Sequence, residues 1–175
     1  SQQLRLLKEY PEARYLQSQC VLYDMVEKQY PELYEKIKQR VAEGRWETEG
    51  GMWLEADCNL TSGESLVRQF LHGKRFFREE FNQDNKILWL PDVFGYSWAL
   101  PQILKQCEID TFMTIKISWS QFNSMPDDLF RWRGIDGSEI LAYFINVPED
   151  IAERFVPVST YNSKMTTEEI YRASK

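Results

Sequence analysis

Charged side chains at the ends of apolar runs are the first candidates for chemistry in this sequence. Asp92 follows the almost continuous apolar run 86–90 after a single proline, while Asp57 and Lys116 lie at the ends of two other strand-like stretches, 46–53 and 111–117. In a parallel α/β fold, functional groups collect just past the carboxyl ends of the strands. Two acids and a base that converge at one such edge are compatible with catalysis by carboxylates.

Each of these residues also has a structural interpretation. A buried, unpaired carboxylate is costly, but Asp92 could cap the following turn, with Gly95 supplying an unusual backbone angle. Asp57 could cap the approach to a helix that begins at Ser62, and Lys116 could simply pair with either acid. The residues by themselves support the cap and the catalyst equally well for Asp92.

Metal-binding and nucleophile motifs are sparse. His72 is the only histidine, and its place in a predicted helix favours a structural or solvated role over metal binding. Histidine and cysteine do not cluster at metal-ligand spacing, so a three-histidine zinc site cannot be assembled from this sequence. The sequence also has no G-x-S-x-G motif, no phosphate-cradling glycine loop and no Cys/His pair.

Alternating apolar runs and helical patterns predict an α/β protein with a parallel sheet and a barrel-like arrangement of strands and outer helices. Pro31 predicts a break near Tyr30 in the helical pattern 21–43, and Asp136-Gly137 predicts a tight turn between two strands. The run 86–90 is typical of a strand buried on both faces. The expected strands are 14–18, 45–48, 86–90, 111–117, 129–133 and 139–145, and the other expected helices begin at Ser62 and span 100–107.

Composition limits the classes of partner. The chain has 175 residues, 43% of them hydrophobic, which is ample for a buried core. A net charge of −6 argues against binding nucleic acid or an anionic membrane, and no apolar run is long enough to cross a bilayer. Three widely spaced cysteines fit reduced thiols in the cytoplasm.

Both ends predict that residues 1–175 are one segment of a larger domain. The first ten residues are typical of the end of a helix, and the polar tail 149–175 stops inside a helical pattern that begins at Thr166. A partial domain leaves strands unpaired, so we expect the isolated segment to aggregate or self-associate. Homo-oligomerisation of the whole protein is left open.

Several sequence blocks, in this order, resemble glycoside hydrolase family 38, and they are closer to the bacterial and cytosolic α-mannosidases than to the Golgi or lysosomal branch. A weaker similarity extends through 10–12 and 17–19. The matching blocks are 44–47, 49–57, 62–69, 88–97, 100–104 and 132–138.

The resemblance implies part of a (β/α)7 barrel-like catalytic domain and a zinc-dependent, retaining hydrolysis of terminal α-mannosides in oligosaccharides. It makes Asp92 the nucleophile and a zinc ligand. It makes Phe94 an aromatic residue of the sugar site, and Lys116 a cation that stabilises the negative charge of Asp92. Asp57 is a weaker substrate-binding candidate.

The sequence also departs from the family pattern. The first zinc motif would fall before Ser1, the remaining zinc histidine and the acid/base carboxylate would fall after Lys175, and Tyr143 stands where the family usually has histidine. We therefore expect the isolated segment to be inactive. The alternatives are a hydrolase of mannosyl-glycerate or its 6-phosphate, whose anionic substrate would require a basic cluster, and a non-catalytic sugar-binding or structural fragment.

Overall fold

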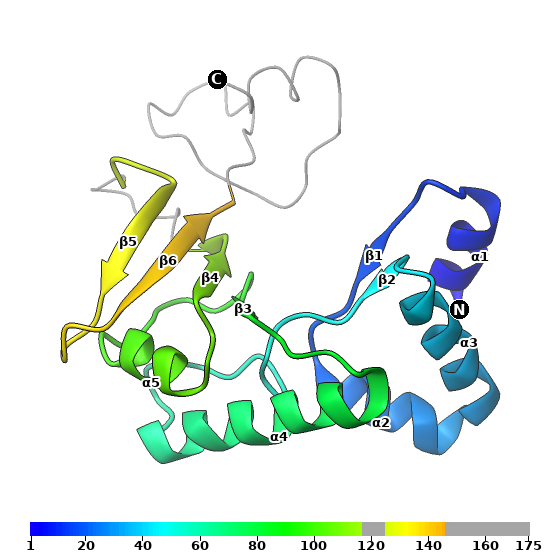
Figure 1. Cartoon of the computed structure of the whole chain (residues 1–175), viewed down its shortest axis with the longest axis horizontal. Coiled ribbons are helices and arrows are strands. Elements are labelled where there is room, and N and C mark those ends of the chain that lie inside the picture. Colours follow the sequence, from blue (N-terminus) through cyan, green and yellow to red (C-terminus); the bar gives the residue numbers. More distant parts are fainter. Residues whose placement is uncertain (117–124, 146–175) are drawn as a thin grey trace.

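The computed structural model describes residues 1–116 and 125–145. The strands lie on one side of the long helix at residues 63–81, with the C-terminal hairpin at one end of the molecule and the N-terminal helices at the other (Figure 1). The predicted tail helix at Thr166 lies outside the described residues. In chain order the elements are α1 (Gln2–Glu9), β1 (Tyr15–Leu16), α2 (Cys20–Gln29), α3 (Pro31–Ala42), β2 (Trp46–Glu47), α4 (Gly63–Phe81), β3 (Ile87–Trp89), α5 (Leu100–Gln106), β4 (Thr111–Thr114), β5 (Leu129–Arg133) and β6 (Glu139–Phe144).

Local signals in the sequence account for the starts of α3 and α4. Pro31 occupies the first turn of α3, and the chain breaks at Tyr30, as predicted. The hydroxyl of Ser62 accepts a hydrogen bond from the N–H of Ser65 and caps α4. The first ten residues are largely helical, as predicted. At the start of α1 the Ser1 hydroxyl accepts the N–H of Leu4 at 3.4 Å.

The sheet is mostly parallel, as the alternating pattern predicts. Strand β1 pairs with β2, and β3, β4 and β6 pair with one another, all in parallel. A single parallel bridge between Gly50 and Leu88 joins the segment after β2 to β3. Consequently the carboxyl ends of β1, β2, β3 and β4 point the same way.

The C-terminal hairpin is the antiparallel exception. Strand β5 pairs with β6 through the predicted turn, in which Gly137 has φ 87°. Because β5 is the last strand of the order β3-β4-β6-β5, the sheet formed by the described residues is open at this end. These residues therefore form an α/β sheet but do not close a barrel.

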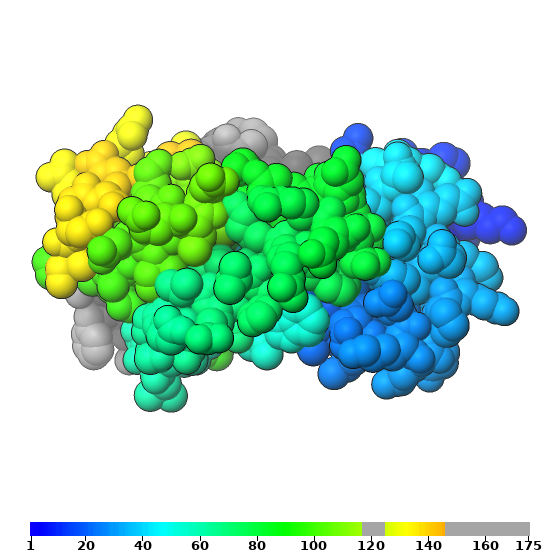
Figure 2. Space-filling view, turned by 60° about the horizontal axis from the view of Figure 1, so that its bottom comes forward, coloured from blue at the N-terminus to red at the C-terminus, as the bar shows by residue number. Residues whose placement is uncertain are grey.

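Two hydrophobic clusters hold the fold together, and α4 contributes to both. Leu66 and Phe70 pack with β3, β4 and β6, whereas Phe77 and Phe81 pack with α2 and α3. Seen from the side turned toward the bottom of Figure 1, the α4 region lies between the β5–β6 hairpin and the N-terminal helices (Figure 2).

Strand β3 is less buried than its composition predicts. Leu88 is fully buried, but Ile87 and Trp89 are only partly buried. Successive side chains of a strand point to opposite faces, so one face of β3 carries the core and the other is incompletely covered by the described residues. Within these same residues, no helix has the length and hydropathy required to cross a membrane.

Candidate active site

Asp92 and Lys116 form an ion pair at the carboxyl ends of β3 and β4. Lys116 Nζ lies 3.0 Å from Asp92 Oδ1, and the Lys116 side chain is 7% exposed while that of Asp92 is 60% exposed. A buried ammonium needs a charged partner, so the lysine holds the carboxylate while leaving it accessible from solvent. The structure thus brings together the two residues that the sequence placed at neighbouring strand ends.

Phe94 also contacts Lys116. Its ring centroid lies 5.0 Å from Lys116 Nζ, a cation–π distance. Phe94 is nevertheless 79% exposed, so most of its surface is accessible. The geometry therefore offers an exposed aromatic face next to an accessible carboxylate.

Asp57 does not join this pair in the structure. Its carboxylate accepts the backbone N–H groups of Asn59 at 2.8 Å and of Leu60 at 2.7 Å. These bonds lower the pKa of Asp57, with the bond from Leu60 as the largest cause. The structure therefore agrees with the interpretation of Asp57 as a capping residue, because its carboxylate binds backbone N–H groups of the turn that follows it.

Gly95 has a different role from the predicted one. It is not among the residues with positive φ, so it does not supply an unusual backbone angle. A Cβ at Gly95 would instead lie 2.4 Å from Nδ2 of Asn59. The Asn59 side-chain amide thus lies against the loop that carries Asp92, and it would have to move to admit a Cβ at Gly95.

Glu55 is the acidic residue that the sequence analysis missed. It lies beyond the segment that pairs with β3, and its half-buried carboxylate accepts the hydroxyl of Ser18 at 2.9 Å. Burial raises the pKa of the Glu55 carboxyl, and the negative charge of Asp92 contributes to the same shift. The sequence does place Glu55 two residues before Asp57 and so near the same strand end. Spacing alone could not show which of the two carboxylates the charge of Asp92 affects.

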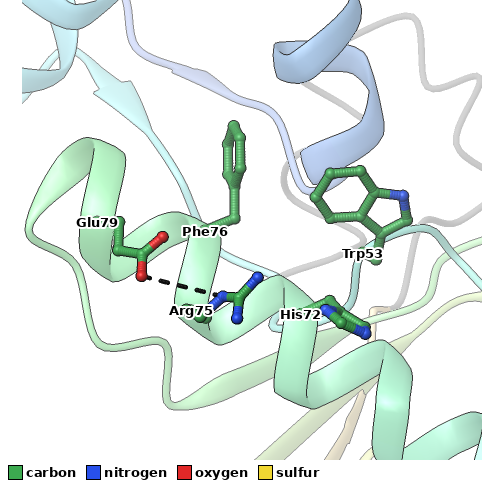
Figure 3. A pocket seen from close by; sticks show the side chains of 5 residues that line it. All are labelled: Trp53, His72, Arg75, Phe76 and Glu79. Carbon is green, nitrogen blue, oxygen red and sulfur yellow. Dashed lines mark ion pairs between the residues drawn. The ribbon is translucent and has the colours of Figure 1, made fainter.

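His72 lies apart from the ion pair, in a pocket of about 330 Å³ on the outer side of α4. Figure 3 shows His72, Arg75, Phe76 and Glu79 along the helix, with Trp53 approaching from the loop after β2. Arg75 and Glu79 form a wide ion pair of 3.9 Å. Asp92, Phe94 and Lys116 do not line this pocket.

The described residues do not by themselves make a zinc site. Asp92 offers a carboxylate, which is a suitable ligand type. Residues 1–116 and 125–145 contain no group of three His, Cys, Asp or Glu side chains able to hold a metal ion. Tyr143, the other departure from the family pattern, is partly buried on β6 opposite Leu129, and nothing in the structure explains the substitution.

The fold and site define an α/β protein with an accessible, lysine-paired carboxylate at the carboxyl edge of a parallel sheet. The chain belongs to glycoside hydrolase family 38, because residues 1–175 match the profile described as "Glycosyl hydrolases family 38 N-terminal domain". It is 42% identical to Alpha-mannosidase G of Dictyostelium discoideum over 174 residues, which are 99% of this chain and 15% of that protein. It is 45% identical to human Alpha-mannosidase 2C1 over 141 residues, 81% of this chain and 14% of that protein.

Solved structures support the same architecture. An alpha-mannosidase from Enterococcus faecalis V583 superposes with a TM-score of 0.65 at 22% identity, covering 81% of this chain and 16% of that chain. A 4-alpha-glucanotransferase from Thermococcus litoralis gives a TM-score of 0.67 at 18% identity, covering 81% and 22%. At these identities the two structures bear on the fold alone. The chain spans about 15% of the length of the curated relatives described above.

Proposed function

We propose that the protein containing this chain is a retaining α-mannosidase in which Asp92 is the nucleophile. The observation that carries the proposal is the pairing of solvent-accessible Asp92 with buried Lys116 at a shared strand edge. The names of the relatives support mannosides as the substrate class. The (β/α)7 barrel, of which residues 1–175 would be one segment, and a cytoplasmic location belong to the same proposal.

In the proposed reaction, the Asp92 carboxylate attacks the anomeric carbon and the glycosidic C–O bond breaks. The leaving oxygen takes a proton from a second carboxylic acid, which the family resemblance assigns outside residues 1–175. Lys116 holds the attacking oxygens in position. The exposed ring of Phe94 offers a surface for the apolar face of the sugar, so the chain's own contributions are attack, orientation and stacking.

Zinc is proposed as the cofactor, with Asp92 supplying one ligand and the others outside this chain. A bound zinc ion would hold sugar hydroxyls and stabilise charge near the scissile bond. Elemental analysis of the full-length protein and of its Asp92→Asn variant tests this separately from activity. Zinc in the wild-type protein and less in the variant is expected, whereas equal zinc in both excludes Asp92 as a ligand.

Asp92→Asn in the full-length protein tests the nucleophile. We expect kcat for an aryl α-mannoside to fall by at least about 1,000-fold, because asparagine cannot form the glycosyl-enzyme intermediate. Asp57→Asn is the matched control, since it makes the same chemical change in a carboxylate engaged by its own turn. Its turnover should stay within about tenfold of the wild type. A folded Asp92→Asn variant with undiminished turnover would favour a structural or sugar-binding fragment instead.

The mannosyl-glycerate alternative stays a second prediction about the substrate. It needs a basic cluster for the carboxylate of its substrate, and among residues 1–116 and 125–145 the cation paired with Asp92 is Lys116, at 3.0 Å.

A further inference from the structure

The loop that carries Asp92 is held by two hydroxyl groups from different parts of the chain. The Tyr96 hydroxyl lies 3.0 Å from the carbonyl oxygen of Leu90 and 2.9 Å from that of Val93. It also contacts the hydroxyl of Thr114, whose oxygen lies 2.8 Å from the carbonyl oxygen of Leu90. Each of the two hydroxyls has one proton, so Tyr96 and Thr114 each donate one hydrogen bond at a time within this network. The two carbonyls flank Asp92 in the sequence, so the hydroxyl network spans the turn on which the carboxylate sits.

This network begins at the carboxyl end of the β3–β4 ladder. Just past β3, the N–H of Leu90 donates to the carbonyl of Met113 on β4 at 3.0 Å. Thr114 is the next residue of β4, and Lys116 follows two positions later. The hydroxyls therefore extend the connection between the two strands, and they tie the residues preceding Asp92 to the strand that carries its lysine partner.

The surroundings of Tyr96 fix its hydroxyl in place. Thr114 and Leu90 are fully buried, and the Tyr96 ring packs edge-on against Phe112 with centroids 4.7 Å apart. Burial also raises the pKa of Tyr96, so the hydroxyl stays protonated and available as a donor. A tyrosine used only to fill the core would not need its hydroxyl at the two carbonyls beside a reactive carboxylate.

We propose that Tyr96 is a positioning residue, which acts with Thr114 to hold the turn 90–93 so that Asp92 faces Lys116. Its kinetic consequence rests on the proposed function, but its structural consequence does not. Without the Tyr96 hydroxyl, the Val93 carbonyl loses this bond and the turn gains freedom on the side of Asp92 away from β3. The carboxylate should then sample orientations that do not suit attack.

The kinetic test uses the full-length protein with three variants and a control. Tyr96→Phe should lower kcat for an aryl α-mannoside by about 10- to 100-fold with a smaller change in KM, because orientation and not sugar binding is lost. Thr114→Val should also lower kcat. The double variant should lose less than the product of the two single losses, since both hydroxyls act on one turn.

Tyr34→Phe is the matched control. Like Tyr96, Tyr34 has a hydrogen-bonded hydroxyl, which donates to Glu80 at 3.0 Å. Tyr34 is buried, whereas Tyr96 is partly buried, and Tyr34 belongs to the hydrophobic cluster that Phe77 and Phe81 form with α2 and α3. We expect its kcat to stay within about twofold of the wild type even where the melting temperature falls. If Tyr96→Phe and Tyr34→Phe lower stability alike and neither changes kcat, Tyr96 is a core residue and the proposal is overturned.

Amide hydrogen exchange provides a readout that does not depend on activity. Peptides covering 90–97 should exchange faster in Tyr96→Phe than in Tyr34→Phe or the wild type. Unchanged exchange there would also overturn the proposal. If the wild-type protein has no mannosidase activity, the proposed function fails while hydrogen exchange still decides whether Tyr96 holds the turn.

Discussion

Replacing Gly73 by alanine should destabilise the protein, although the same change in an ordinary helix interior is stabilising. Gly73 lies in the middle of α4, where alanine would gain about 1 kcal/mol in helix propensity. A Cβ at this position would lie 2.4 Å from the Gly51 oxygen, 2.5 Å from the Met52 carbonyl carbon and 2.7 Å from the Trp53 nitrogen. All three are backbone atoms, so no side-chain rotation can relieve the overlap.

The expected magnitude follows from these two opposing effects. Overpacking a tight interior costs about 1–3 kcal/mol, and three backbone contacts place Gly73→Ala at the upper end of that range. After subtraction of the propensity gain, the free energy of unfolding should fall by about 2 kcal/mol. The Trp53 N–H, which donates to the Gln69 carbonyl at 3.0 Å, should be displaced from α4. Because Glu55 follows two residues later, the edge near Asp92 should move as well.

Gly63→Ala is the internal control for this prediction. Gly63 begins the same helix, has no positive φ, and leaves open space around the position that a Cβ would take, with no atom within 4 Å. In thermal unfolding of the full-length protein, Gly63→Ala should therefore melt at or above the temperature of the wild type. Gly73→Ala should melt below both the wild type and Gly63→Ala. A Gly73→Ala variant that melts at or above Gly63→Ala would refute the argument that close backbone approach requires glycine here.

Two further predictions concern the ion pair and the exposed ring. Lys116→Met, which keeps the buried stem and removes the charge, should lower kcat/KM by about 10- to 100-fold without a comparable loss of stability, because the 60% exposed Asp92 stays solvated. Lys105→Met, which breaks the surface pair with Asp110, should leave kcat/KM unchanged, and equal losses in both variants would exclude a specific role for Lys116. Phe94→Ala should raise KM for an α-mannoside by about tenfold while changing the free energy of unfolding by less than about 0.5 kcal/mol, as measured by steady-state kinetics and denaturant melts. An unchanged KM would remove Phe94 from the sugar site.

The sequence by itself determined the features that depend on local chemistry. Pro31 cannot continue the preceding helix because it lacks the N–H group, so the break at Tyr30 was predictable. Ser62 caps α4 through a bond to a residue three positions away, and Asp136-Gly137 permits the tight turn of the hairpin. Each depends on a few neighbouring residues. The placement of Asp92 directly after an apolar strand is of the same kind.

Only the tertiary structure decided which of the candidate groups meet. Asp92 and Lys116 are 24 positions apart in the sequence, and their contact exists because β3 and β4 pair in parallel and in a fixed register. Glu55 and Asp57 are close in sequence, yet the charge of Asp92 acts on Glu55 while Asp57 is held by its own turn. The requirement for glycine at Gly73 likewise comes from the backbone of residues 51–53, which lie 20 to 22 positions earlier in the sequence. Such contacts depend on packing between distant segments, which no local pattern of residue types can specify.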